Sequence, residues 1–478
     1  MGWVPELIYD GGSFQRNRAL VCNDSGEIAG IVPASTIKDR TSLNGRAALP
    51  GLVNAHSHAF QRVIRGRTEY RTPNRKDSFW TWREMMYSAA TRLSPEDVYD
   101  ASRMAFLEMA LTGITSVGEF HYLHHAPEGA PYGESNLLAK QVVRAAADVG
   151  LRIALLRVAY ARSGFETEIN PLQARFIEND PNTYLASAEQ LASDLKQSSN
   201  PENPTAWAGV APHSVRAVAL PYLKEVVAFA NKRQLRVHMH VAEQQAEVSA
   251  SIAEYGRSPV ALLATEGLLS DRFTAVHSIH VTPKAIAMIA GAGAMVCACP
   301  TTERNLGDGI LPVDEYFKQG VRVALGTDSH VQIDLLEDAR EMEYHLRLQK
   351  MERVILANEP TKILSSREPT SPLPRANTSD LAAALFSCAT LRGAESIGSP
   401  GGVLDEGHAA DFFTVDLDDP SIAGSSDGDL LSSLVFSLSR TAVRDVVVGG
   451  KRIVEDGRHP HQQEIVERFQ ALQTKLWA

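Results

Sequence analysis

Two histidines separated by one residue, His56 and His58, follow an apolar run near the start of the chain. The run, residues 47–53, is typical of a buried strand, and Asn54 and Ala55 lead from it to the histidines. Side chains alternate faces along a strand, so His56 and His58 point the same way. Two neighbouring imidazoles are half of a metal site. The pair therefore predicts metal chemistry, provided that later strands end on further ligands.

Candidate partners lie where later strand-like segments end. Segment 235–243 contains His240 and, three residues on, Glu243; segment 273–280 contains His277; segment 321–328 ends on Asp328. A lone histidine at a strand end is more often structural than a ligand. Several such groups at one end of a barrel favour a metal site.

The middle of the chain alternates strand-like and helical patterns, which predicts the elements that position these groups. The strand-like runs are 114–120, 152–160, 207–211, 235–241, 273–278, 294–299 and 321–327, and helical patterns include 95–111, 135–149, 220–232 and 283–289. With the opening strand they predict an α/β fold, a (β/α)8 TIM barrel whose site lies at the carboxyl ends of the strands. The alternative is an open doubly wound sheet, but no glycine-rich phosphate loop follows the first strand.

The two ends of the chain resemble each other more than they resemble the middle. Both contain short apolar runs broken by Gly and Asp, and residues 443–454 form a hairpin signature around Gly449 and Gly450. We therefore expect a small composite β-sandwich domain from residues 1–48 and 400–478, and a barrel domain from residues 49–399.

Composition excludes several classes of protein. The chain has 478 residues and a formal net charge of −10, which disfavours a nucleic-acid partner. No run reaches transmembrane length, and the N-terminus lacks a basic segment followed by an apolar stretch, so we expect a cytoplasmic protein with no membrane partner. Four cysteines make no disulfide framework, and Cys297 and Cys299 are interpreted as small core residues.

The candidate ligands His56, His58, His240 and Asp328 form a set rich in nitrogen and oxygen. Such a set suits Zn²⁺, and iron or manganese less well. The fourth strand leads to His213 without a lysine, which disfavours a lysine-bridged second metal. One ion per subunit is therefore expected.

A metal at this place would lower the pKa of a bound water toward neutrality. Asp328 can then accept a proton from the water, and Glu243 can carry protons to the leaving group as a general acid. His277 can orient the water and polarise the electrophile. His238 shares strand parity with His240 and is interpreted as a structural residue one layer lower in the barrel.

Seven segments together resemble a known family: HSHAFQRVIRG, DSFWTWREMMY, GEFHYLHH, APHSVRAV, HVAEQ, TTERNLGDG and GTDSHV. They resemble the amidohydrolase superfamily in its mononuclear deaminase branch and, more closely, the formimidoylglutamate deiminase family. That family hydrolyses N-formimidoyl-L-glutamate to N-formyl-L-glutamate and ammonia in histidine degradation. The resemblance covers essentially the whole chain and implies a homodimer.

The resemblance implies a role for each matching residue of this sequence. It implies metal binding by His56, His58, His240 and Asp328, catalysis by Glu243, His277 and Asp328, and substrate binding by Gln61, Arg83, Tyr122, His213 and Arg216. The substrate, an amidine with two carboxylates, needs guanidinium groups placed locally in an acidic protein. Without the resemblance, a surface salt bridge explains either arginine equally well. Arg304 departs from the family pattern, where a smaller residue is expected, and is predicted near the pocket rim.

Two other functions are weighed against this one. A related deaminase acting on another amidine or on an aminopurine or triazine ring would not need two arginines. A non-catalytic barrel predicts the loss of Glu243, His277 or Asp328, and all three are present. The long polar segments 65–77, 162–182 and 358–377 are candidate lid loops or partner contacts, with plain surface excursions as the alternative.

Overall fold

The middle of the chain forms a parallel barrel in the computed structural model, which describes residues 2–71, 77–165, 170–198, 200, 203–357 and 379–478. Its strands pair in the order β13-β12-β11-β10-β9-β8-β7-β6. They are β6 (Leu52–Ser57), β7 (Ile114–His121), β8 (Arg152–Ala159), β9 (Ala206–Pro212), β10 (Val237–Val241), β11 (Phe273–His277), β12 (Met295–Ala298) and β13 (Val323–Leu325). A parallel bridge between Ser57 and Asp328 joins the first strand to the segment after the last. The predicted TIM barrel is confirmed.

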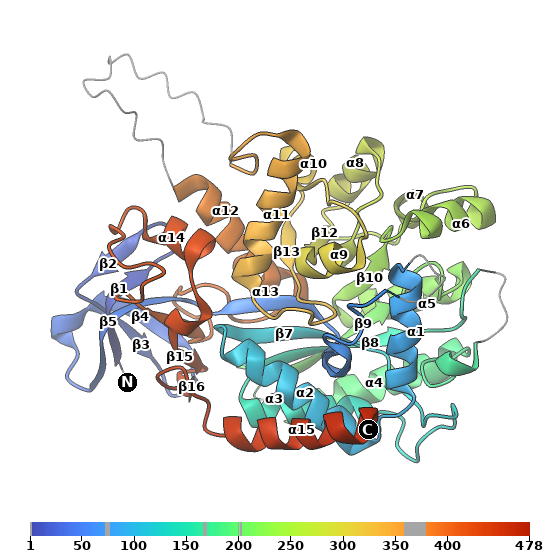
Figure 1. The fold of residues 1–478 in the computed structure, drawn as a ribbon, viewed down its shortest axis with the longest axis horizontal. Coiled ribbons are helices and arrows are strands. Elements are labelled where there is room, and N and C mark those ends of the chain that lie inside the picture. The colour runs from blue at the N-terminus through green and yellow to red at the C-terminus, as the bar shows by residue number, and fades with distance from the viewer. Residues whose placement is uncertain (1, 72–76, 166–169, 199, 201–202, 358–378) are drawn as a thin grey trace.

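Helices surround the barrel (Figure 1). They are α1 (Phe79–Ala90), α2 (Pro95–Ala110), α3 (Leu137–Val149), α4 (Pro181–Ser198), α5 (Leu220–Arg233), α6 (Gln245–Tyr255), α7 (Pro259–Thr265), α8 (Pro283–Gly291), α9 (Pro300–Leu306), α10 (Val313–Lys318), α11 (Leu335–Lys350), α12 (Ser379–Ala389) and α13 (Leu391–Ile397). Local sequence sets their ends: α2 begins with a capping box between Ser94 and Asp97, and Pro95 occupies its first turn. None of the helices described is long and apolar enough to cross a membrane.

Both ends of the chain build a second, mixed sheet beside the barrel (Figure 1). Its strands are β1 (Gly2–Tyr9), β2 (Phe14–Arg16), β3 (Arg18–Cys22), β4 (Ile28–Pro33), β5 (Arg40–Pro50), β14 (Phe412–Asp416), β15 (Val443–Val448) and β16 (Lys451–Val454). The hairpin predicted around Gly449 and Gly450 is the antiparallel pair β15–β16. The combination of the two ends is as predicted, and the domain boundaries near residues 48 and 400 remain predictions.

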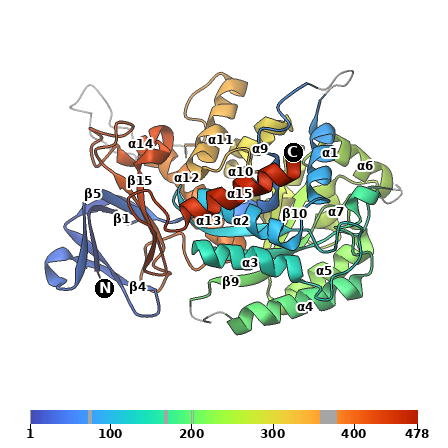
Figure 2. The same ribbon diagram turned by 60° about the horizontal axis from the view of Figure 1, so that its bottom comes forward.

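The C-terminal segment leaves this sheet and returns to the barrel. Helix α14 (Leu430–Ser437) precedes β15, and α15 (Gln462–Trp477) follows β16. Figure 2 shows α15 lying along α2. Ion pairs join the two helices, including Arg103 with Glu464 at 2.7 Å and Arg468 with Asp100 at 2.7 Å.

The apolar run 47–53 is not one strand, in contrast to our expectation. Its first part ends β5 in the mixed sheet, and its second part begins β6 in the barrel. The break is at Gly51, where an added Cβ would overlap the side chain of Thr115. A close approach of this kind requires glycine. The run is buried on both sides of the break, so hydrophobicity alone could not reveal it.

A buried ion pair connects the two sheets. Arg152, at the start of β8, donates to Asp411 through Nε at 2.7 Å and Nη2 at 3.0 Å. Asp411 precedes β14 and also accepts from the backbone N–H of Gly449 at 2.7 Å. The Arg152 and Asp411 side chains are 1% and 0% exposed, so removal of either charge would leave the other without compensation.

Replacement of this carboxylate tests its structural role. Asp411→Ala should lower the free energy of unfolding by about 3–5 kcal/mol, because Arg152 would stay buried without a counter-charge. Denaturant unfolding followed by circular dichroism measures the change. The control is Asp427→Ala, which removes a bidentate partner of the half-exposed Arg16 and should cost less than about 1 kcal/mol. Equal losses in the two variants would contradict this role.

Candidate functional site

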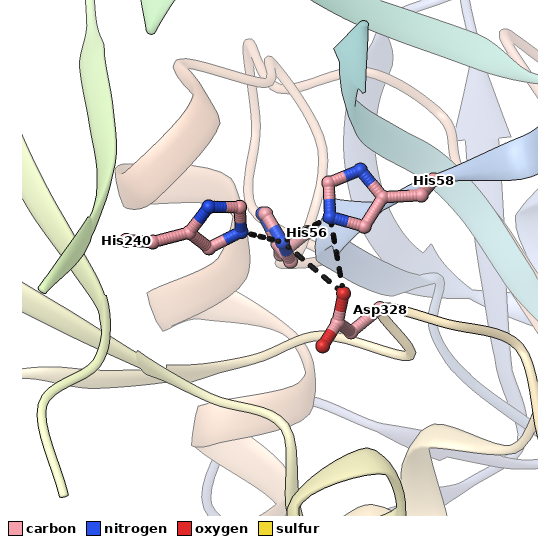
Figure 3. A group of neighbouring side chains, drawn as sticks. All are labelled: His56, His58, His240 and Asp328. Carbon is pink, nitrogen blue, oxygen red and sulfur yellow. Dashed lines mark hydrogen bonds and ion pairs between the residues drawn. The ribbon is translucent and has the colours of Figure 1, made fainter. Parts of the chain in front are cut away.

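Four side chains converge at the carboxyl end of the barrel (Figure 3). His56 Nε2 lies 3.2 Å from His58 Nε2 and 3.1 Å from His240 Nε2. Asp328 Oδ1 lies 3.4 Å from His56 Nε2 and 3.2 Å from His58 Nε2. Ligands about 2.1 Å from a tetrahedral zinc ion would be about 3.4 Å apart. The donor types and their spacing therefore fit a divalent metal ion.

The protonation states of these groups also fit a metal. His58 Nδ1 bonds to the carbonyl oxygen of Phe120 at 3.0 Å, which leaves the Nε2 lone pair directed at the cluster. Burial lowers the pKa of His56 to about 3 and that of His240 well below its usual value. Burial opposes the charge of Asp328, but its contacts with His56 and His58 hold its pKa well below its usual range. Neutral imidazoles and an ionised carboxylate are the forms that bind metal.

Left-handed backbone turns side chains into the site at several strand ends. Ala242 after β10, His277 and Ser278 at the end of β11, and Asp328 after β13 have φ values of 52°, 66°, 56° and 47°. Such values are uncommon for residues with a side chain and cost roughly 1–3 kcal/mol each. These unfavourable backbone conformations occur together at one end of the barrel, which indicates that this end is a functional site.

His277 lies beside the four-donor cluster and faces three carboxylates. Its Nδ1 is 3.2 Å from Glu303 Oε1, and its Nε2 is 3.7 Å from Asp328 Oδ2 and 3.9 Å from Glu243 Oε1. Burial opposes its protonation, but Glu243, Glu303 and Asp328 together raise the pKa of His277 well above its usual value. Burial also raises the pKa of Glu243, which favours a proton on its carboxyl group.

Sequence analysis missed Glu303, although it lies in the TTERNLGDG segment. Glu303 is in the first turn of α9 and accepts from both His277 Nδ1 and the backbone N–H of Cys299. The sequence offered one sign of a functional role for Glu303, namely an acidic residue in the first turn of the helix after a barrel strand. That sign does not separate a site residue from an ordinary one, because acidic residues at helix N-termini are common for helix stability alone.

A small cavity of about 40 Å³ opens onto this cluster. Its lining includes all five predicted substrate residues, namely Gln61, Arg83, Tyr122, His213 and Arg216. It also includes aromatic and apolar side chains that sequence analysis did not single out: Phe79, Trp82, Met86, Tyr87, Tyr160 and Leu306. The structure therefore brings the predicted substrate residues together with the predicted ligands.

The two arginines of the cavity have no acidic partner. Within the described part of the chain, neither Arg83 nor Arg216 has a carboxylate oxygen within 4.0 Å. Arg83 Nη2 donates to the hydroxyl of Tyr160 at 3.0 Å, and Arg216 Nη1 is buried with no hydrogen-bond partner among the described residues. Buried cations without counter-charges are costly. The cavity is therefore suited to an anionic ligand.

Other contacts hold the substrate residues in place. Gln61 lies in the short helix η2 (Ala59–Ile64) and donates to the Tyr122 hydroxyl at 2.7 Å, while its own Oε1 is buried without a partner in the described chain. Gln173, from segment 162–182, donates to the Tyr160 hydroxyl at 2.6 Å. That segment thus supports the wall of the cavity behind Arg83.

The remaining predicted residues lie outside the cavity. His238 Nε2 bonds to the carbonyl oxygen of Ser396 in α13 at 3.1 Å, which agrees with a structural interpretation. Arg304 is 42% exposed, pairs with Glu341 at 2.7 Å and is absent from the described lining of the cavity. Segments 65–77 and 162–182 are described in part, and segment 358–377 lies outside the described residues.

Comparison with known proteins places this site in a family. A model of the amidohydrolase family matches residues 47–453. The chain belongs to the amidohydrolase family. Formimidoylglutamate deiminase of Pseudomonas aeruginosa is 35% identical over 455 residues, which cover 95% of this chain and 94% of that protein. The match supports a hydrolase that acts on C–N bonds.

Solved structures agree with this membership. An amidohydrolase from Brucella melitensis matches with a TM-score of 0.87 and 33% identity over 100% of both chains. An adenosine deaminase from Xanthomonas campestris with bound zinc matches with a TM-score of 0.81 over 99% of this chain and 98% of that chain. At 22% identity, this second likeness shows a shared fold.

A polar network underlies the metal ligands of this amidohydrolase. Ser57, between the two histidines, donates to Glu119 Oε2 and lies 3.0 Å from His330 Nε2. Glu119 Oε1 accepts from the backbone N–H of Ala59 at 2.8 Å, and His330 Nδ1 lies 3.1 Å from the Thr327 hydroxyl. The network connects the segment of His56 and His58 to the residue before Asp328.

Disruption of this network should weaken metal binding. Glu119→Gln places an amide N–H₂ opposite either the Ser57 hydroxyl or the Ala59 N–H, which both donate to Glu119. The substitution should lower metal affinity by about 10- to 100-fold. Competition with a chromophoric chelator measures the affinity. Glu343→Gln is the matched control. Glu343, on α11, is also buried and accepts a hydrogen bond at each oxygen, in its case from two backbone N–H groups at 3.0 and 2.9 Å. Equal affinities in the two variants would exclude this role for Glu119.

Proposed function

We propose that this amidohydrolase hydrolyses N-formimidoyl-L-glutamate to N-formyl-L-glutamate and ammonia, with one zinc ion per subunit. The observation that carries the proposal is a pair of guanidinium groups, those of Arg83 and Arg216, that form no ion pair among the described residues and line a cavity that opens onto the candidate metal ligands. A dicarboxylate can form an ion pair with each of the two guanidinium groups. The name of the Pseudomonas aeruginosa relative supports the same substrate.

A divalent ion on His56, His58, His240 and Asp328 would supply Lewis acidity to the attacking water and to the amidine. Asp328 Oδ2, which faces His277 rather than the other ligands, accepts the proton of the water. His277, held by Glu303, donates from Nε2 to the oxygen that attacks the formimidoyl carbon.

Glu243 completes the proton transfers. Its raised pKa keeps a proton available for the nitrogen of the leaving group. The bond from carbon to that nitrogen then breaks, and ammonia leaves with the proton. The oxygen of the water becomes the carbonyl oxygen of the formyl product, while the nitrogen of glutamate keeps its bond to carbon.

The remaining polar residues of the cavity orient the substrate. Arg83 and Arg216 hold the two carboxylates, and Gln61 and Tyr122 add hydrogen bonds at their side of the cavity. His213 lies between Tyr160 and His240, with ring centroids 4.6 and 4.8 Å away, so it separates the arginine region from the metal ligands. In the proposed complex, the substrate extends from the arginine region to the metal ligands.

A neutral ring substrate fits this cavity less well. An aminopurine or triazine would leave both guanidinium groups without counter-charges. The choice of zinc is supported by the nitrogen-rich donor set and by the zinc of the Xanthomonas campestris deaminase. We also propose a role in histidine degradation, a homodimer, and a cytoplasmic location, which is supported by four cysteines that form no disulfide among the described residues.

An ammonia assay tests the proposed reaction. The protein should release ammonia from formimidoylglutamate. This release should stop after treatment with a chelator and recover when zinc is added. Adenosine should release little, because it has no carboxylate. Glu243→Gln should keep the metal and lose turnover. Faster release from adenosine, or none from formimidoylglutamate by the zinc-loaded protein, would refute the proposal.

Substitution of the arginines tests substrate recognition separately. Arg83→Met and Arg216→Met should each raise KM for formimidoylglutamate by about 10- to 100-fold, since a hydrogen bond to a charged group contributes about 1.5–3 kcal/mol. Steady-state kinetics measures this change. Arg304→Met, which removes an exposed arginine paired with Glu341, should leave KM unchanged. An unchanged KM in both cavity variants would show that these arginines do not bind the carboxylates.

A further inference from the structure

A second group of metal-binding side chains lies directly beside the first. His277, Cys299 and Asp328 are buried, and one donor atom from each lies within 4.8 Å of the other two. We propose that these three residues hold a second, thiophilic divalent ion, and that its binding inhibits the enzyme. The inhibition rests on the proposed function, whereas the binding itself does not.

Asp328 has a free oxygen for a second ion. Its Oδ1 lies 3.4 and 3.2 Å from the ligand nitrogens of His56 and His58, so it belongs to the first group. Its Oδ2 instead faces His277 Nε2 at 3.7 Å. That distance is too long for a hydrogen bond but close to the separation of two ligands on one metal ion. A single carboxylate can therefore serve both groups.

His277 can offer its Nε2 to an ion. Glu303 holds Nδ1 at 3.2 Å and keeps a proton on that nitrogen, so an incoming ion replaces only the proton on Nε2, which leaves to water in the cavity. His277 also lines the cavity, so an ion that enters with solvent can reach it. Glu243 Oε1, at 3.9 Å from Nε2, adds negative charge on the same side.

Cys299 makes this group different from the first. It follows β12 directly and belongs to the same interior cluster as Cys297 and Met295, at the end of the barrel nearest the site. The sequence suggested only a small core residue, but its sulfur reaches the donors of His277 and Asp328. Thiolate favours thiophilic ions such as Cd²⁺ and Zn²⁺ over harder ions. When the sulfur binds the ion, the thiol proton leaves to water in the cavity.

Such an ion would block the reaction without displacing the first one. It would occupy Asp328 Oδ2 and His277 Nε2, the two atoms assigned to the proton and the oxygen of the attacking water. Excess metal should therefore inhibit an enzyme that a single ion activates. Substrate concentration should not overcome this inhibition, because Arg83 and Arg216 lie outside the second group.

The test is a titration of the zinc-loaded enzyme with Cd²⁺, followed by ultraviolet absorption and by ammonia release. Only a thiolate ligand produces the sulfur-to-cadmium charge-transfer band, so replacement of the first ion at its nitrogen and oxygen ligands would not produce it. We expect the band and the inhibition to rise together, with one bound equivalent.

Two matched variants locate the thiol. Cys299→Ala should lose the band and raise the inhibition constant by at least about tenfold, since even indirect partners of a metal contribute 10- to 100-fold to affinity. Cys297→Ala, a buried cysteine of the same cluster, should keep both. Each inhibition constant is measured against the uninhibited rate of the same variant.

The proposal fails if the wild-type enzyme shows no charge-transfer band, or if Cys299→Ala keeps the band or the inhibition. Where Cys299→Ala does not fold, the more conservative Cys299→Ser makes the same test, since an oxygen ligand gives no sulfur-to-cadmium band. An enzyme that shows the band but does not turn over formimidoylglutamate would refute the proposed function and leave the second ion site standing.

Discussion

Closure of the barrel between β6 and the segment after β13 is the contact on which the site depends. The backbone N–H of His58 donates to the carbonyl oxygen of Asp328 at 3.0 Å, and the N–H of Asp328 donates to that of His56 at 3.0 Å. The first and last of the proposed metal ligands along the chain are thus joined by backbone hydrogen bonds. Gly326 makes this possible, because an added Cβ would meet His56 Cβ at 2.7 Å. The geometry of the metal ligands is therefore a direct consequence of barrel closure.

Charged side chains of opposite sign line the cavity at the end of the closed barrel, and we assign them to proton transfer and to substrate binding. Carboxylates gather around His277, the proposed place of proton transfer, and two guanidinium groups that form no ion pair among the described residues line the same cavity, where a dicarboxylate is proposed to bind. Other buried guanidinium groups are compensated, either by a carboxylate, as with Arg157 and Glu178 at 2.6 Å, or by backbone carbonyl oxygens, as with Arg175. Arg83 and Arg216 depart from that pattern, which is why they carry the argument about substrate.

The sequence predicted the barrel and the convergence of its ligands, because both follow from local patterns. Strand periodicity places His56 and His58 on one face, and parallel strands bring their carboxyl ends to one rim. The break at Gly51, by contrast, depends on Thr115, which is remote in sequence. Glu119, Glu303 and Cys299 have buried positions that arise only when strands β6, β7, β11 and β12 are assembled. Their roles are long-range, and a single sequence carries no signal that separates them from ordinary core or helix-end residues.

The division of Asp328 between its two oxygens links these observations. One oxygen lies beside the group of histidines, and the other faces His277, so the same residue belongs to both the proposed metal site and the proposed proton path. Its left-handed backbone, with φ of 47°, holds the carboxylate between both groups. The same carboxylate also has a donor oxygen within 4.8 Å of the thiol of Cys299. The proposed second ion site therefore follows from the geometry that is proposed for the one-metal reaction.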